Sequence, residues 1–223
     1  MIRIWNGVKY TLGERRLQKE VKKRYYHDDL FSQLDRTLLT AYIFKNPYKI
    51  SKNYLENRQA KEVHQYGETP LMTYEKIARE AQLEPTDTLL ELGSGRGRGA
   101  FFLHHFFKCR VVGIERIPQF VKLSRHLSDK YCRGRVSIIC GDMLKEDLPE
   151  ATAVYLYGTA LSDDEITLLV RKLKRYPQAT KIISISYPLT DYDEQAFRIE
   201  KTFSVSFLWG ETEAYIQKVG HHG

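Results

Sequence analysis

The sequence predicts an α/β fold, in which a mainly parallel sheet carries helices on its faces, and three observations predict it. Apolar residues 89–92 lead into Gly-Ser-Gly-Arg-Gly at 93–97, and an apolar stretch follows at 101–107. Two later apolar segments, 110–114 and 136–140, are each followed by an acidic residue. Strand, tight turn and helix alternating in this order are typical of parallel sheets with helical crossovers.

The glycine run is the most informative of these features. Gly93, Gly95 and Gly97 permit positive φ angles, and because they lack a Cβ a ligand can approach the main chain closely. Glu115 ends the second strand, 22 positions after Gly93, where an acid can bind two vicinal ribose hydroxyls. Asp142 follows the third strand and is placed to accept from an exocyclic adenine amine. Acids at the ends of successive parallel strands indicate a nucleoside-containing ligand.

With an acidic glycine loop (Glu91 to Gly97), a ribose acid at Glu115 and an adenine acid at Asp142, the chain resembles the class I S-adenosylmethionine-dependent methyltransferases. The resemblance covers roughly residues 63–219. It implies a Rossmann-like sheet of seven strands and S-adenosyl-L-methionine (SAM) as the cofactor, with Glu91 meeting the SAM amino group. The cofactor-binding residues that it implies are Tyr66, Thr69, Glu91, Gly93, Ser94, Gly95, Gly97, Glu115, Arg116, Asp142 and Met143.

A nicotinamide-binding domain is the main alternative for this loop. Its Gly-x-Gly-x-x-Gly pattern fails when started at Gly93, because residue 98 is arginine. Started at Gly95 the pattern passes in relaxed form, ending at Ala100. Two strands flanking a turn at 209–212 favour the methyltransferase, since class I enzymes close their sheet with an antiparallel hairpin. The remaining elements expected are a helix at 71–81 with Thr69 as candidate cap, a strand at 153–159, a helix at 162–176, and strands at 181–188, 202–208 and 213–219.

Three short patterns bear on the methyl acceptor. Tyr-x-x-Thr-Pro at 66–70 is similar to a segment of some seven-strand lysine methyltransferases. Tyr-Pro-Leu at 187–189 and Trp-Gly-x-Thr at 209–212 resemble the small lysine methyltransferases related to the ATP-synthase c-subunit enzymes. The resemblance implies a protein lysine as acceptor and direct SN2 displacement. The patterns therefore favour a protein substrate.

Tyr157 is the candidate catalytic residue. With Tyr155 and Tyr66 it would line an apolar acceptor channel, and such a channel disfavours the charged form of lysine. The alternative interpretation is a tyrosine of the core. Methyl transfer to RNA or to a small molecule stays open, although the Asn/Asp-Pro-Pro-Tyr/Phe motif of enzymes that methylate base amines is missing after 153–156. A SAM-binding module without catalysis is a third hypothesis.

The N-terminal segment carries the charge excess. Residues 1–62 hold 14 Lys and Arg against 7 Asp and Glu, a net of +7, which equals the formal net charge of the whole chain. Helices are expected at about 14–26 and 31–44, and Pro47 and residues 53–61 are expected in a linker. We expect two parts: a basic helical extension (1–62), acting as a lid or in substrate recognition, and a SAM-binding domain (63–223). RNA or another acidic partner would suit the extension, and a solvated helical face is the simpler interpretation.

Composition argues against several classes of protein, namely membrane-spanning, secreted and metal-binding ones. No apolar run approaches the roughly 20 residues of a membrane span, and no signal-peptide core is present. Three cysteines without short pairing predict a reducing compartment, and hence the cytoplasm. Cys140 lies in an expected strand, where it is expected to be a small buried hydrophobe. The histidines are not spaced for a metal site.

Overall fold

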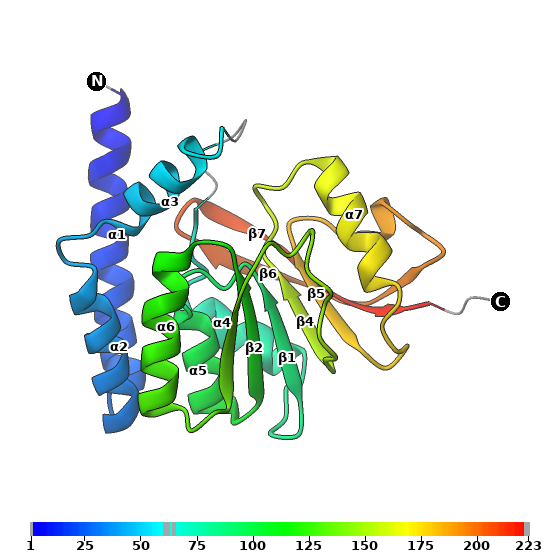
Figure 1. The fold of residues 1–223 in the computed structure, drawn as a ribbon, viewed down its shortest axis with the longest axis horizontal. Helices are drawn as coiled ribbons and strands as arrows, with labels where there is room; N and C mark the ends of the chain where they lie inside the picture. Colours follow the sequence, from blue (N-terminus) through cyan, green and yellow to red (C-terminus); the bar gives the residue numbers. More distant parts are fainter. Residues whose placement is uncertain (1, 60–62, 64–65, 221–223) are drawn as a thin grey trace.

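The computed structural model describes residues 2–59, 63 and 66–220, with side chains from residue 13 onward. Seven strands form one sheet, in the order β3-β2-β1-β4-β5-β7-β6 (Figure 1). The strands are β1 (Thr88–Leu92), β2 (Arg110–Glu115), β3 (Val136–Cys140), β4 (Ala153–Leu156), β5 (Lys181–Ile185), β6 (Phe197–Phe207) and β7 (Gly210–Val219). The helices are α1 (Ile2–Tyr25), α2 (Asp29–Ala41), α3 (Pro47–Glu56), α4 (Leu71–Glu80), α5 (Arg98–Phe107), α6 (Pro118–Tyr131) and α7 (Asp163–Leu173), with a 3₁₀ turn η1 (Leu189–Asp191).

Strand direction confirms the expected sheet. β1 to β5 run parallel, whereas β7 pairs antiparallel with both β5 and β6. The carboxyl ends of β1, β2 and β3 therefore meet at one edge. The strand order changes direction between β1 and β4, which is where open sheets of this kind bind ligands.

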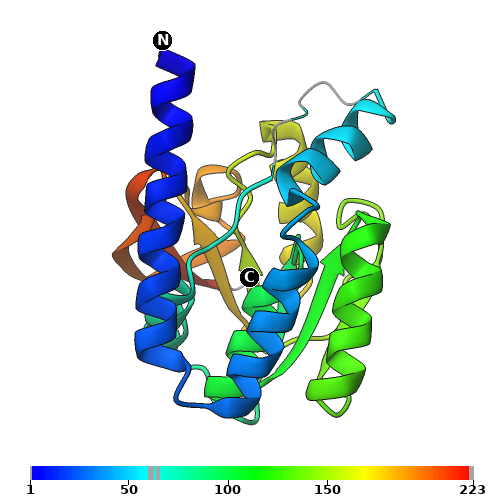
Figure 2. The same ribbon diagram turned by 90° about the vertical axis from the view of Figure 1, so that its left-hand side faces the viewer.

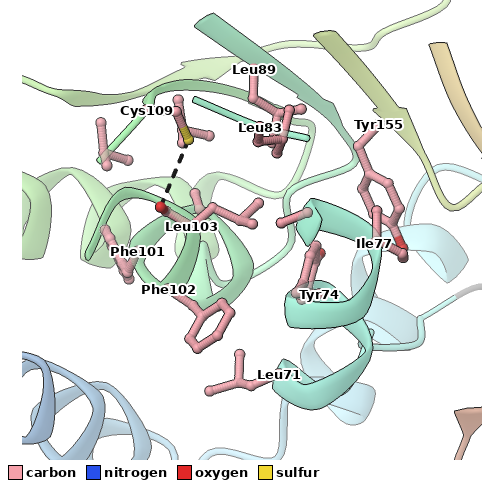
Figure 3. Packing of buried hydrophobic residues seen from close by; sticks show 14 of the residues in the cluster. Leu71, Tyr74, Ile77, Leu83, Leu89, Phe101, Phe102, Leu103, Cys109 and Tyr155 are labelled. Carbon is pink, nitrogen blue, oxygen red and sulfur yellow. Dashed lines mark hydrogen bonds between the residues drawn. The ribbon is translucent and has the colours of Figure 1, made fainter. Parts of the chain in front are cut away.

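Each face of the sheet has its own hydrophobic core. One core joins α4, α5 and α6 to the sheet, and the other is covered by α7 and η1. Figure 3 shows side chains of α4 and α5 packed side by side, with Leu89 of β1 and Tyr155 of β4 close to them. Because the sheet is covered on both faces, its parallel strands are nearly continuous apolar runs.

The N-terminal helices α1 and α2 add an outer layer on the α5 side, as Figures 1 and 2 show. Leu34 and Leu38 of α2 are fully buried, and the ring of Tyr25 meets that of Phe102 at 4.9 Å between centroids. Asp28 caps α2 by accepting from the Phe31 N–H at 2.8 Å. The extension therefore shares the core of the sheet domain.

Three sequence expectations were wrong in detail. Pro47 and residues 53–56, expected in a linker, belong to α3, because the Asn46 side chain accepts from the N–H groups of Tyr48 and Lys49 and Pro47 occupies the first turn. Thr69 does not cap α4: its hydroxyl shares a 2.7 Å hydrogen bond with Tyr155, and the helix has no side-chain cap.

Cys140, expected to be buried, is exposed at the end of β3. The expected domain boundary at 62/63 falls in a stretch of which only residue 63 is described, so residue 62 lies outside the described residues.

Replacing Phe102 with alanine should lower the free energy of unfolding by about 3–5 kcal/mol, because the ring is fully buried between α1, α2 and α5. Urea denaturation of the variant measures this. Phe44→Ala is the matched control, since Phe44 is 97% exposed and its loss should change stability by no more than about 0.5 kcal/mol. Equal losses in the two variants would contradict the packing of α1 and α2 on α5.

Candidate active site

The glycine loop turns sharply between β1 and α5. Gly93, Gly95 and Gly97 have φ angles of 82°, 53° and 75°, a left-handed region that favours glycine. The N–H groups of Gly93 and Ser94 both donate to the Ile114 carbonyl oxygen, at 2.9 and 3.0 Å. The loop is therefore held against the end of β2 with its backbone exposed to the pocket beyond.

A pocket lies directly against this loop, and we call it the glycine-loop pocket. It extends from the ends of β1, β2 and β3 to the segment after β4. Its described lining includes Ser51, Tyr66, Gly67, Gly93, Gly95, Glu115, Arg116, Ile117, Asp142, Met143, Tyr157, Gly158, Leu161 and Glu165. Eight of the twelve residues predicted from sequence line it: Tyr66, Gly93, Gly95, Glu115, Arg116, Asp142, Met143 and Tyr157.

Glu115, at the carboxyl end of β2, is held in place by two backbone N–H donors. One carboxylate oxygen accepts from the Gly95 N–H at 2.8 Å and the other from the Ile117 N–H at 2.7 Å. Burial raises the pKa of this carboxyl, and the two backbone donors partly oppose the rise. Each oxygen keeps a lone pair for a further donor, which is the arrangement needed to bind a diol.

A smaller inner pocket lies beneath the loop. Ser94, Thr69, Tyr155 and Tyr157 belong to its lining. The Ser94 hydroxyl is buried and has no hydrogen-bond partner among the described residues. Gly97 lines neither pocket; its place is against Ser124 of α6, to which a Cβ would come within 3.2 Å.

Glu91 lies behind the loop instead of in either pocket. It is 2% exposed, its Oε1 accepts from the Tyr74 hydroxyl, and its Oε2 has no partner among the described residues. Burial raises its pKa to about 8, although the bond from Tyr74 opposes the rise. A buried carboxyl with one unused oxygen fits a cationic or hydrogen-bonding group of a ligand.

Arg96 of the loop and Arg98, the first residue of α5, have roles that the sequence did not indicate. Arg96 donates to both oxygens of Glu68, at 2.6 and 2.7 Å, and its guanidinium lies 4.8 Å from the centroid of the Tyr42 ring. Burial raises the pKa of Glu68, but Arg96 outweighs it, so the pKa is below its ordinary value. Arg98 donates to both oxygens of Asp35 in α2, at 2.7 and 2.8 Å.

The segment before α4 covers the loop as a result. The Glu68–Arg96 pair fixes this segment, and Tyr66 also donates to Glu68. The Tyr66 ring lies over Gly95, where a Cβ would approach it to 3.5 Å. Glu68 and Arg96 lie 28 positions apart, so only the fold reveals the pair.

A second pocket opens beside the glycine-loop pocket, and we call it the aromatic pocket. The two share Tyr66, Gly67 and Tyr157, together with residues 158–161. Trp209 donates its indole N–H to the Tyr157 hydroxyl at 2.9 Å, and Phe207 stacks on both rings. Tyr187, Tyr192, Asp163 and Glu68 complete the charged and aromatic part of its described lining.

No cation is present in the described lining of the aromatic pocket. Its two acids differ: Glu68 is paired with Arg96, whereas Asp163 accepts from the Tyr192 hydroxyl at 2.8 Å and has no cationic partner among the described residues. Within the part of the chain that the structure describes, no cluster of three His, Cys, Asp or Glu side chains could hold a metal. No described helix is long and apolar enough to cross a membrane.

Comparisons with known proteins place the chain in a family. Residues 15–174 match the model of the protein-L-isoaspartate(D-aspartate) O-methyltransferase family. The protein-L-isoaspartate O-methyltransferase of Thermococcus onnurineus is 30% identical over 145 residues, which cover 64% of each chain. A probable ribosomal RNA small subunit methyltransferase A of Methanosarcina acetivorans is 33% identical over 113 residues, or 51% of this chain and 40% of that protein.

Among solved structures, the RNA methyltransferase of Salinibacter ruber in complex with S-adenosyl-L-homocysteine is similar, with a TM-score of 0.58 and 25% identity over 70% of this chain and 95% of that one. The protein belongs to the protein-L-isoaspartate(D-aspartate) O-methyltransferase family, and its fold is that of the class I SAM-dependent methyltransferases. The chain spans less than two thirds of the length of the curated relatives it matches.

Glu115→Ala should weaken SAM binding roughly ten- to a hundred-fold, because a charge-assisted hydrogen bond is worth about 1.5–3 kcal/mol. Isothermal titration calorimetry measures the affinity. Glu84→Ala is the control, since Glu84 is exposed before β1, at the opposite end of the strand from the loop. Unchanged affinity in the Glu115 variant would exclude a ribose contact.

Glu91 should make the stability of the SAM-free enzyme depend on pH. Its pKa is about 8 in the fold against 4.5 for the free group, so the folded state holds a proton that the unfolded state has lost. Stability should therefore fall as pH rises from about 4.5 to 8 and then level off. Melting temperatures measured across this range should fall less in Glu91→Gln, and parallel curves for the two proteins would show that Glu91 is ionised in the fold.

Proposed function

We propose that this enzyme methylates an amine nitrogen, the side-chain nitrogen of a protein lysine, in the aromatic pocket. The observation that carries the proposal is the lining of that pocket, which holds aromatic rings and two acids but no described Lys or Arg. Aromatic faces and carboxylates attract cations, whereas a carboxylate acceptor needs cationic or N–H donors beside it. The pocket chemistry thus favours an amine.

SAM is proposed to occupy the glycine-loop pocket. In this arrangement Glu115 binds the ribose, and Asp142 and Met143 flank the adenine. Glu91 and Ser94 form hydrogen bonds to the methionine end of SAM. The unpartnered Glu91 Oε2 and Ser94 hydroxyl support the assignment, because each retains hydrogen-bonding capacity for a buried ligand. When bound, SAM supplies a methyl group that its sulfonium already activates.

Tyr157 is proposed to act where the two pockets meet. Its ring contributes to the glycine-loop, inner and aromatic pockets, and the bond from Trp209 fixes its hydroxyl. A fixed ring at this junction would align an incoming nitrogen and exclude water, and alignment is the main requirement of a direct displacement.

The acceptor nitrogen must lose a proton before it can attack. For a free lysine of pKa about 10.4, deprotonation at pH 7 costs about 4–5 kcal/mol. Exclusion of water from the amine lowers that cost, because desolvation disfavours the charged form, while the exposed Asp163 at the rim would attract the charged form beforehand. The proton then leaves to water, and we assign no dedicated base.

The family name does not decide the acceptor of this chain. Tyr187, Tyr192 and Trp209 all lie beyond residue 174, where the match to the family model ends. The matched part contains the glycine loop, Glu115 and Asp142. Likeness to the family therefore supports the cofactor half of the site more than the acceptor half.

Methyl transfer to RNA is the second candidate. The likeness to the Salinibacter RNA methyltransferase, at 25% identity, supports it. A nucleobase amine would also suit aromatic walls, since bases stack on such rings. The acids in the lining of the aromatic pocket count against an RNA acceptor there, because they would repel a phosphate inside the pocket.

Product chemistry tests the acceptor class. The enzyme is incubated with methyl-labelled SAM and cell lysate, and the product is split into protease-treated and ribonuclease-treated halves. We expect protease alone to release the label. The protein fraction is then exposed to mild base, which hydrolyses a methyl ester to methanol but leaves an N-methyl bond intact.

Base-stable label on protein, located on lysine by mass spectrometry, is the expected result. The rate should also rise with pH above 7, because the free amine becomes more abundant. Base-labile label would instead identify a carboxyl acceptor, and label released by ribonuclease alone would favour RNA. Glu115→Ala, which we expect to bind SAM roughly ten- to a hundred-fold more weakly, is tested beside the enzyme at low SAM concentration and controls for other methyltransferases in the lysate.

A further inference from the structure

A row of cations follows one side of α1, and we call it the basic stripe. It consists of Arg15, Arg16, Lys19, Lys22 and Lys23, all of which are exposed. At 3.6 residues per turn the five fall within an arc of about 120°.

The buried side of α1 faces the opposite way. Val21 and Tyr25, which pack into the core beside α5, lie on the other side of the helix axis. The basic stripe therefore points to solvent and does not serve the packing of α1.

No acid interrupts the stripe. Of the two acids in this part of α1, Glu20 pairs with Arg24, at 3.6 Å, and Glu14 accepts from the Tyr48 hydroxyl. None of the five stripe cations has an ion pair with a described residue. Five unpaired like charges repel one another, so a polyanion bound along the helix would relieve that repulsion.

The stripe begins beside the aromatic pocket. Gly13 lies against Leu208 of the β6–β7 turn: a Cβ at Gly13 would come within 2.9 Å of the Leu208 Cδ2. Leu208 and Trp209 both line the aromatic pocket, and Figure 2 shows α1 passing in front of the β6 and β7 strands. A molecule that lies on the stripe thus reaches the rim of that pocket.

We infer that the basic stripe binds single-stranded RNA through its phosphates. From Arg15 to Lys23 the helix rises about 12 Å, a length over which one strand presents about three or four phosphates. The Trp209 ring, 52% exposed at the near end of the stripe, offers a flat surface for stacking a base. A cation row that ends at an exposed aromatic ring matches a strand of alternating phosphates and bases better than it matches a carboxylate-rich peptide.

This inference is separate from the identity of the methyl acceptor. RNA held on the stripe could carry the acceptor itself or bring an RNA-bound protein to the aromatic pocket. Binding is therefore measured without SAM turnover, so failure of lysine methylation and failure of RNA binding give different results.

The test uses fluorescence anisotropy of the full chain with labelled poly(U) of about 20 nucleotides over a series of KCl concentrations. The stripe variant is Arg15→Glu/Lys19→Glu/Lys22→Glu. The matched control is Lys122→Glu/Lys145→Glu/Arg171→Glu, three exposed cations of other elements with the same change in net charge. Circular dichroism and SAM titration establish that each variant is folded, and the neutral triple glutamine variant of the stripe gives a milder second test.

We expect the unmodified chain to lose affinity with salt, with a log–log slope of about −2.5 for three or four phosphates at about 0.7 each. The stripe variant should bind at least ten-fold more weakly, with a slope flatter by about 2, whereas the control triple changes little. If both triple variants lost affinity for poly(U) equally, the effect would come from net charge alone, and the inference would be overturned. Tighter binding of poly-glutamate than of poly(U) would overturn it too, by assigning the stripe to an acidic protein.

Discussion

The glycine loop depends on two arginine–carboxylate pairs that hold it from different directions. Arg96 binds Glu68 in the segment before α4, and Arg98 binds Asp35 in α2. Removing one partner of such a buried pair leaves an unpaired charge, typically at a cost of about 3–5 kcal/mol. The pairs therefore fix two segments, distant in sequence, around the loop. The covering segment and the N-terminal helices become parts of the site for this reason.

The two pockets follow from this arrangement. Glu68 positions Tyr66 over Gly95, and the same segment brings Gly67 against the ring of Tyr157. Ser51, from the N-terminal extension, is a wall of the glycine-loop pocket. The extension therefore has a place in the site as well as in the core, and its outward face, the basic stripe, is free for a partner.

The glycine-loop pocket and the aromatic pocket share Tyr66, Gly67 and residues 157–161, and each adds residues from other parts of the chain. The strand ends that meet the glycine loop belong to the region shared with the family, because every class I enzyme must hold the same SAM molecule. The aromatic pocket adds Tyr187, Tyr192 and Trp209, which come from the segment after β5 and from the C-terminal hairpin. Those segments can vary without disturbing the loop, so members of one fold family can differ in acceptor.

The sequence by itself determined the class of fold and eight of the residues that line the glycine-loop pocket. The patterns of strand, glycine and acidic residues are local in the sequence, and parallel strands bring their carboxyl ends to one edge of the sheet. Gly93, Glu115 and Asp142 could therefore be placed together from the sequence alone. The sequence also contained the signal for α3, Asn46 followed by Pro47, which was missed. Only the tertiary structure decided the partners of Arg96 and Arg98, the withdrawal of Glu91 behind the loop, and the meeting of Tyr157 with Trp209. These depend on side chains 17 to 63 positions apart, and no periodicity or motif encodes a contact over such separations.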